Sequence, residues 1–476
     1  MSAQASTQNG VQTLDFSFLA GGAPAAVLGL GKSGMATAIA LKNSGVVIAA
    51  WDDQPAGRDA AKLQGIDLVD LNKADFADMQ FLAMSPGIPL HFPEPHPVAV
   101  RAQDAGCPII GDIELLYRAE PEARYVGITG TNGKSTTTAL IGHILAEAGM
   151  RIAVGGNIGT PVLTFPPVGA DGIYVLEMSS YQLDLLDSLV FDAAILLNIT
   201  PDHLDRHGGM DGYIAAKERI FARQAGAKAA IVGIDSSASR AVAERLAAQG
   251  HARLLPVSVG SAAPHGVSVI DGWLIDDIDG DAVREIDLKA IRRLPGAHNW
   301  QNAAAAWAAA RVSGVPKRVI TAALNSFPGL VHRQQLVRTI GNVAFVDDSK
   351  ATNVDAAEKA LTSYDRIYWI AGGRAKEGGI DALAPFMGNV VHAFLVGEAA
   401  DEFATWLEGR VPATIVGTID RAAAAANAMA QADGQGGTVL LSPACASFDQ
   451  FPNFEVRGRF FVAAVDALPD TTGGQS

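Results

Sequence analysis

The sequence predicts an α/β protein of three domains, each built on a mainly parallel sheet. Short apolar stretches alternate with helical patterns along most of the chain, and this alternation is typical of parallel strands joined by helices. The 476 residues far exceed the roughly 150 residues usual for one domain. Glycine-rich turns follow strands in the first and middle parts of the chain, as they do in sheets that bind nucleotides.

Residues 1–111 are predicted to form a Rossmann-like domain. After Pro24 the pattern is strand, glycine turn at 29–34, helix and strand, and Asp52 falls 18 positions after Gly34. In this arrangement the turn can approach a diphosphate, and the acid can bind a ribose hydroxyl. The glycine pattern does not specify the nucleotide, so an NAD-binding oxidoreductase remains an alternative.

Residues 112–329 are predicted to form a central sheet of the P-loop ATPase type, with a small β-rich excursion at 257–288. The strand ARYVGIT leads into GTNG, which is followed by Lys134, Ser135 and a helical pattern. Glycines let backbone N–H groups wrap phosphate oxygens, while the lysine reaches the outer phosphates and the serine can ligate Mg²⁺. Ile128 stands where a glycine is usual, which is a departure from the general spacing.

Further polar side chains follow buried strands of this central domain. Glu177 ends an apolar strand at the edge where such sheets gather ligands, so it is either a Mg²⁺ ligand or a solvated carboxylate. The segment 202–207 holds five titratable groups in six positions and is either a site or a polar surface loop.

Lys217 lies on an otherwise apolar helix face with Tyr213, Ile220 and Phe221. An unpaired ammonium is costly in such a place. Either its stem extends to water, or it has a phosphate, a carboxylate or a charge-changing modification as partner.

Residues 330–476 are predicted to form a third domain, a second Rossmann-like sheet. Polar clusters follow three of its strands, at 348–353, 372–376 and 442–448. Each cluster is consistent with a capped strand-to-helix turn, but three together favour a binding face. Cys445 is interpreted as a small buried side chain, with a nucleophile as the less favoured reading.

Composition excludes several classes of protein. The net charge is −14 and no basic stripe is present, so nucleic acid is not expected as a partner. Two cysteines are too few for a disulfide framework, and no apolar run reaches the length of a membrane span or signal sequence. We therefore expect a cytoplasmic protein with no membrane partner.

In their order along the chain, these motifs resemble the Mur ligase family over nearly the whole sequence. The matching segments are GTNGKST, GGNIG at 155–159, EMSSYQ, NITPDHLDRH, YIAAKERIF, GAHNWQN at 296–302, the His-Arg pair at 332–333, DDSKATN, GGRAK and SPACASFDQFPNFEVRG. Within the family, SPACASFDQF and the N-terminal unit are similar to the member that adds D-glutamate. The DNPR-type motif usual in the diaminopimelate-adding member is not found.

The resemblance implies an ADP-forming amide ligase of peptidoglycan precursor synthesis. The carboxylate of UDP-N-acetylmuramoyl-L-alanine would take the γ-phosphoryl group of ATP, and the amine of D-glutamate would attack the acyl phosphate. The three domains, in chain order, would bind the UDP-substrate, ATP and D-glutamate. Two Mg²⁺ ions are implied as cofactors. We expect a monomer whose partners are the three small-molecule substrates.

The resemblance also implies roles for individual residues. Lys134, His203 and Lys217 would be catalytic, and the metal ligands would be Ser135, Glu177, His203 and Lys217. In the family the lysine at the position of Lys217 is typically carbamylated. ATP would contact Gly130, Thr131, Asn132, Gly133, Lys134, Ser135, Thr136, Asn299, Asn302, Arg333 and Asp348. The UDP-substrate would contact Lys32, Ser33, Asp52, Gly87, Asn157, Ser179, Gln182 and His203. D-Glutamate would contact Lys350, Thr352, Lys376, Ser447, Phe448 and Phe454.

One departure concerns the uridine site, where relatives often place a Thr-Arg pair after the acid and this chain has Asp53 and Gln54. A charge partner would then have to come from elsewhere. A folylpolyglutamate synthase-like ligase remains a second alternative, because it shares the phosphate loop.

Overall fold

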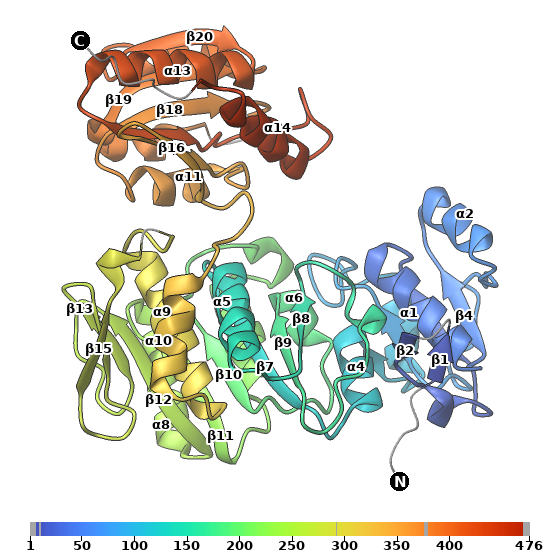
Figure 1. Ribbon diagram of the computed structural model, residues 1–476. Helices are drawn as coiled ribbons and strands as arrows, with labels where there is room; N and C mark the ends of the chain where they lie inside the picture. The colour runs from blue at the N-terminus through green and yellow to red at the C-terminus, as the bar shows by residue number, and fades with distance from the viewer. Residues whose placement is uncertain (1–5, 9–10, 292, 376–378, 470–476) are drawn as a thin grey trace. The chain divides into compact units, whose positions relative to one another are not determined.

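The computed structural model describes residues 6–8, 11–291, 293–375 and 379–469, and it confirms the predicted α/β class (Figure 1). The chain forms two compact units. Unit 1 comprises Met1–Asp287 and Trp300–Ser326, and unit 2 comprises Leu288–Asn299 and Phe327–Ser476. The expected first domain and nearly all of the expected central domain fall in unit 1, and the expected third domain falls in unit 2.

The N-terminal part of unit 1 contains a four-stranded parallel sheet in the order β4 (Ile48–Trp51), β3 (Ala25–Leu28), β5 (Leu82–Met84) and β6 (Ile109–Ile110). Its helices are α1 (Lys32–Asn43), α2 (Pro55–Leu63), α3 (Pro97–Asp104) and α4 (Asp112–Ala119). Side chains of β3 alternate between two apolar cores, Ala25 and Val27 in one and Ala26 and Leu28 in the other. Burial on both faces explains why the strand reads as an uninterrupted apolar run. A short antiparallel pair, β1 (Ser6–Gln8) and β2 (Val11–Thr13), precedes this sheet.

The rest of unit 1 is built on a nine-stranded sheet. From one edge to the other it runs β15 (Val283–Asp287), β14 (Trp273–Asp276), β13 (Val267–Ile270), β12 (Ala252–Val259), β11 (Gly226–Gly233), β10 (Ala193–Leu196), β7 (Arg124–Thr129), β9 (Ile173–Glu177) and β8 (Ile152–Gly156). The strands from β8 to β13 in this order are parallel to one another. Strand β14 is antiparallel to β13, and β15 is antiparallel to β14. The expected β-rich excursion is therefore present, and it extends the edge of the central sheet.

Six helices accompany this sheet: α5 (Lys134–Glu147), α6 (Ser180–Asp184), α7 (Met210–Glu218), α8 (Ser237–Gln249), α9 (Ala297–Val312) and α10 (Lys317–Ser326). Helix α10 packs against α5, the helix that follows the glycine loop. Among the described residues, no helix combines the length and the apolar character needed to cross a membrane.

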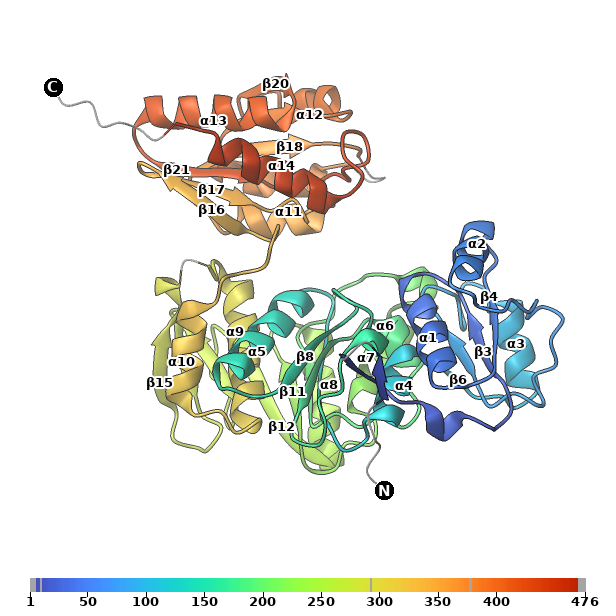
Figure 2. The ribbon, with the colours of Figure 1, turned by 45° about the vertical axis from the view of Figure 1, so that its right-hand side comes forward.

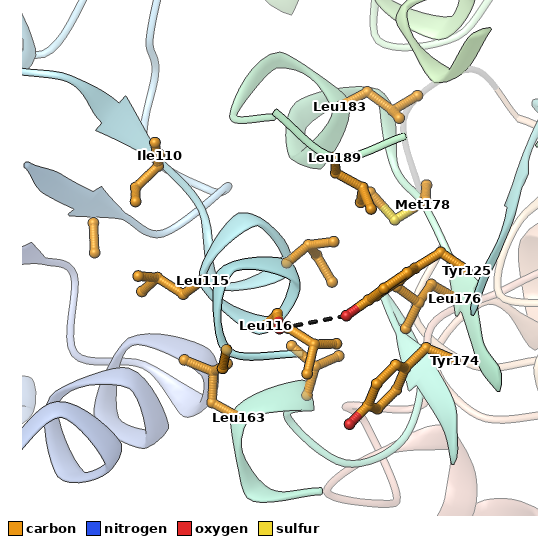
Figure 3. Close-up of a cluster of buried hydrophobic side chains, with 14 of the residues drawn as sticks. Ile110, Leu115, Leu116, Tyr125, Leu163, Tyr174, Leu176, Met178, Leu183 and Leu189 are labelled. Atoms are coloured by element: carbon orange, nitrogen blue, oxygen red, sulfur yellow. Dashed lines mark hydrogen bonds between the residues drawn. The ribbon is translucent and has the colours of Figure 1, made fainter. Parts of the chain in front are cut away.

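One apolar core joins the two sheets of unit 1, and α4 lies within it. Leu115 and Leu116 of α4 belong to the same cluster as Tyr125 and Tyr174 of the central sheet (Figure 3). The two tyrosine rings stack with centroids 5.2 Å apart, and the Tyr125 hydroxyl donates a hydrogen bond to the carbonyl oxygen of Leu116. Packing against both sheets makes α4 one of the elements that connect them.

Unit 2 contains a six-stranded sheet in the order β16 (Gln335–Ile340), β17 (Val343–Asp347), β21 (Gly437–Leu441), β18 (Ile367–Gly372), β19 (Val390–Val396) and β20 (Ala413–Gly417). Only the β16–β17 pair is antiparallel. Trp369 and Tyr368 of β18 point into different cores. Helices α11 (Val354–Leu361) and α12 (Ala400–Leu407) cover one face, and α13 (Ile419–Asp433) and α14 (Phe454–Asp466) cover the other (Figure 2).

A buried carboxylate fastens α4 to residues 187–189, in the segment that leads into β10 of the central sheet. Glu114 is fully buried and accepts hydrogen bonds from the backbone N–H groups of Asp187, Ser188 and Leu189 at 3.0–3.2 Å, and from Arg118 Nε at 3.1 Å. Burial by itself would raise the pKa of Glu114, but these hydrogen bonds outweigh it and the pKa is lowered. The ionised carboxylate therefore stabilises the folded state.

Replacing Glu114 by Gln is expected to lower the free energy of unfolding at neutral pH by about 3 kcal/mol, because donors would then meet a neutral amide. Since the folded-state pKa is lowered, the carboxylate stabilises the fold above its unfolded pKa and loses this effect as pH falls through the folded value. The free energies of unfolding of the wild-type protein and the variant, measured with urea, should therefore converge at acid pH. Glu122→Gln, at an exposed position of the same segment, is the control, and an equal loss in that variant would contradict the assignment.

Candidate active site

The strongest predicted motif is a tight loop between β7 and α5. Gly133, just before α5, has a φ of 85°, a backbone conformation that favours glycine. A Cβ atom there would also overlap Oδ1 of Asn302. The loop thus brings Asn302 of α9 against the N-terminus of α5, where helix N–H groups are suited to bind an anion. Both residues belong to unit 1.

Two lysines meet at the start of this loop. Lys134 Nζ donates hydrogen bonds to the carbonyls of Gly130 (2.9 Å) and Thr131 (2.8 Å), and Lys217 Nζ donates to the same Gly130 carbonyl (2.9 Å). Lys217 is only 2% exposed, and no carboxylate of the described residues forms an ion pair with it. Burial, together with the nearby charge of Lys134, lowers the pKa of Lys217 well below its ordinary value. The structure therefore excludes the reading in which the Lys217 stem extends to water.

Beside the loop, three polar side chains come together from α5, from the end of β9 and from the residue after β8. Ser135 Oγ donates to Glu177 Oε2 (2.6 Å), and Asn157 Nδ2 donates to Glu177 Oε1 (2.9 Å). Within the described residues, no group of three or more His, Cys, Asp or Glu side chains could hold a metal alone. One hydroxyl and one carboxylate fit Mg²⁺, which typically binds through one or two carboxylates plus phosphates and water.

The segment after β10 divides into an exposed and a buried half. His203 has a φ of 51°, and its half-exposed ring has Nε2 3.5 Å from Asp202 Oδ2. His207 is buried, with Nε2 2.8 Å from Ser180 Oγ and its ring stacked on Tyr181. Burial lowers the pKa of His207, and the positive charge of Lys217 adds to the effect. Sequence reasoning gave no role to His207, although its motif was recognised.

Ser179 and Gln182 form a reciprocal cap at the start of α6. Gln182 N–H donates to Ser179 Oγ (3.2 Å), and Ser179 N–H donates to Gln182 Oε1 (3.1 Å). Such a capping box satisfies two backbone donors at a helix N-terminus. Both side chains thus fix the helix that follows Glu177.

In the first sheet, Asp52 organises the glycine turn. Its two carboxylate oxygens accept hydrogen bonds from the N–H groups of Leu30 (2.6 Å) and Gln54 (2.7 Å). Lys32 is exposed and Ser33 half-buried at the beginning of α1. Arg58 Nη1 donates to the carbonyls of Asp52 (2.6 Å) and Asp53 (2.9 Å). Arg58 is a cation beside Asp52 that the sequence pattern did not reveal.

Gly87 connects the first sheet to the segment after β10. Its carbonyl accepts a hydrogen bond from Arg206 Nη1 (3.2 Å), and the Arg206 guanidinium lies 4.6 Å from the centre of the Tyr181 ring. A cavity of about 310 Å³ lies beside this contact, with Phe92, Asp184 and Arg219 among its lining residues.

In unit 2, Asp348, which is predicted to contact ATP, follows β17 and lies beside Ser442, which follows β21. Burial raises the pKa of Asp348 to about 7, although the Ser442 hydroxyl donates to Oδ2 at 2.8 Å. Arg333 lies close enough for its charge to counter this shift. Asn299, also in unit 2, donates through Nδ2 to the carbonyl of Pro295 (2.7 Å).

Among the residues predicted to bind an amino acid, Lys350 and Thr352 follow β17, while Ser447 and Phe448 follow β21, the parallel neighbour of β17 in the sheet. Lys350 Nζ lies 3.8 Å from the centre of the Phe454 ring, Ser447 is buried and Phe448 is 64% exposed. The Thr352 N–H donates to the carbonyl of Lys350 (2.8 Å). Lys376 lies outside the described residues.

Arg457, on α14, ties these segments together. It is 2% exposed and donates from Nε to Ser349 Oγ (3.0 Å) and from Nη2 to the carbonyls of Ser349 (2.8 Å) and Cys445 (3.0 Å). Burial lowers its pKa to about 10 and raises the pKa of Cys445 to about 12, which argues against a nucleophilic thiolate. The EVRG segment was recognised in the sequence, but nothing in the pattern showed that its arginine is buried.

Three protein-family models match successive parts of this chain. The family model of the Mur ligase middle domain matches residues 128–310, that of the Mur ligase glutamate ligase domain matches 332–445, and that of the MurD-like N-terminal domain matches 23–111. Among solved structures, UDP-N-acetylmuramate-alanine ligase from Thermotoga maritima has a TM-score of 0.56 at 16% identity, covering 94% of this chain and 99% of its own. At that identity the likeness concerns the fold.

Curated relatives are much closer in sequence. A UDP-N-acetylmuramoylalanine--D-glutamate ligase from Rhodospirillum rubrum is 52% identical over 451 residues, which is 94% of each chain. Proteins of the same name from a Caulobacter species and from Rhizobium johnstonii are each 50% identical over 94% of this chain and over 97% and 95% of their own chains. The phosphate loop, the matching models and these full-length relatives agree, and the chain belongs to the Mur ligase family.

Proposed function

We propose that this chain is the ATP-dependent ligase that adds D-glutamate to UDP-N-acetylmuramoyl-L-alanine in peptidoglycan precursor synthesis. The observation that carries the proposal is the 52% identity, over 94% of both chains, to a relative named for this activity. The match of the MurD-like N-terminal model to residues 23–111 favours this activity over a folate-type ligase or an NAD-dependent oxidoreductase.

In the proposed reaction, the substrate carboxylate attacks the γ-phosphorus of ATP and releases ADP. The amine of D-glutamate then attacks the acyl phosphate, forms the amide and expels phosphate. Little covalent chemistry is asked of the protein, so its work is positioning and charge neutralisation. Lys134 and the N-terminus of α5 supply positive charge for phosphates.

Ser135 and Glu177 would hold one Mg²⁺, and His203 with Lys217 would serve a second. Bound Mg²⁺ neutralises charge on the phosphate oxygens. A lysine with a lowered pKa is partly in its neutral amine form, which can add CO₂ to give a carbamate and release one proton. That modification would turn Lys217 into an anionic ligand and remove its repulsion with Lys134.

The proposal assigns the three expected domains to the three substrates. Residues 1–111 would bind the UDP-substrate through Asp52 and Gly87, and residues 112–329 would bind ATP. Residues 330–476 would bind D-glutamate through Lys350, Thr352, Ser447, Phe448 and Phe454, with Lys376 as a further candidate. The enzyme would act as a monomer in the cytoplasm.

The direct test measures phosphate release from ATP and Mg²⁺ with UDP-N-acetylmuramoyl-L-alanine and a panel of D-Glu, L-Glu, D-Ala, L-Lys and meso-diaminopimelate. Release is expected with D-Glu alone, together with a product heavier by one glutamyl residue. Turnover with another amino acid would contradict the assigned specificity. No turnover with any of them would contradict the proposed activity.

Replacing Lys217 by Ala is expected to lower kcat by at least about a hundredfold, because a ligand of the second Mg²⁺, and with it the charge neutralisation of the phosphates, is lost. Added acetate should restore part of the activity if the missing group is a carboxylate-like metal ligand. Lys73→Ala, at an exposed lysine, is the matched control. Full activity in Lys217→Ala without acetate would contradict its role, and loss without any rescue would contradict the carbamate.

A further inference from the structure

A chain of side-chain hydrogen bonds runs from Asp235 to the backbone of the phosphate loop. Gln301 Nε2 donates to Asp235 Oδ2 (2.8 Å), and Asn198 Nδ2 donates to Gln301 Oε1 (3.2 Å). Asn198 then holds Asn132 at both of its backbone polar groups. The Asn132 N–H donates to Asn198 Oδ1 (2.9 Å), and Asn198 Nδ2 donates to the Asn132 carbonyl (3.2 Å).

The residues of this chain come from separate segments of unit 1. Asn198 follows β10 and Asp235 follows β11, which are neighbouring parallel strands, while Gln301 lies on α9 and is 8% exposed. Asn132 lies two positions before Lys134. The side chains meet because parallel strands end at the same edge of the sheet.

The polarity of the chain is set at its far end. A carboxylate only accepts hydrogen bonds, so Gln301 must turn its NH₂ group toward Asp235 and its oxygen toward Asn198. Asn198 must then turn its NH₂ group toward Gln301, which leaves its oxygen for the Asn132 N–H. Asp235 is itself held by Ser258 Oγ (2.7 Å) and the Val259 N–H (3.1 Å), both of which donate to Oδ1.

We propose that Asp235, Gln301 and Asn198 are positioning residues for nucleotide binding, in which the Asp235 carboxylate orients two amides that hold the phosphate loop at Asn132. The inference rests on the proposed function only in that ATP is taken as the ligand of this loop. None of the three side chains needs to touch the nucleotide, since each acts through the next.

The hydrogen bond between Asp235 and Gln301 permits a reciprocal test. In Asp235→Asn an NH₂ group would face the NH₂ group of Gln301, and the orientation of both amides would reverse. In Gln301→Glu two carboxylates would face each other. In the double variant the amide of residue 235 can donate to the carboxylate of residue 301, which can also accept from Asn198, so the polarity at Asn132 is restored.

ATP affinity, measured by equilibrium titration with Mg²⁺, is expected to weaken by about tenfold in each single variant, which corresponds to the loss of one strong hydrogen bond. The double variant should return to within about threefold of the wild type. Affinity for UDP-N-acetylmuramoyl-L-alanine should stay unchanged in all three. Gln249→Glu, at an exposed position of α8, is the matched control and should bind ATP normally.

Additive losses in the double variant would overturn the inference, because a merely structural role predicts no rescue. Asn198→Ala breaks the series of hydrogen bonds without adding charge. It therefore tests the inference even if one of the other single variants fails to fold. Wild-type ATP affinity in Asn198→Ala would also overturn the inference and leave the proposed function standing. Absence of ATP binding in the wild-type protein would overturn both.

Discussion

Two ammonium groups share the carbonyl of Gly130, and the rest of the site depends on this contact. Lys134 approaches from the start of α5 and Lys217 from α7, so one backbone oxygen joins the helices on either side of the loop. Burial disfavours the charge on Lys217, and the nearby charge of Lys134 adds to this cost. The arrangement is therefore stabilised when negative charge is supplied, as it is by phosphates or by a modification of the lysine.

The fold explains how such a cluster arises from scattered residues. The strands β7, β9, β10 and β11 are parallel neighbours in one sheet, so the loops that follow them meet at one edge. That edge collects the glycine loop, Glu177, Asn198 and Asp235, while α9 contributes Gln301 and Asn302. Burial of the strands on both faces leaves their ends as the place for polar side chains.

The sequence was sufficient for the class of fold, the glycine loop and the polar clusters after several of the strands, because these depend on local periodicity and composition. Strands β16 and β20 were not predicted, since β16 is mostly half-buried, β20 is mostly exposed, and neither has a long apolar run. Arg457, His207 and the Asp235 chain were not predicted as parts of a site either. Many of their contacts join residues far apart in the sequence, such as the 27 positions between His207 and Ser180 and the 66 between Gln301 and Asp235, and no local pattern encodes such pairs.

The measurement that bears most directly on the lysine pair is the thermal unfolding of the wild-type protein with Mg²⁺ and either ATP or AMP. ATP at about a hundred times its dissociation constant should stabilise the protein by about 2.7 kcal/mol and raise Tm by about 5 °C. AMP, which lacks the outer phosphates, should leave Tm unchanged at the same concentration. Equal shifts with both nucleotides, or no shift with ATP, would contradict the conclusion that this loop gathers positive charge for a polyphosphate.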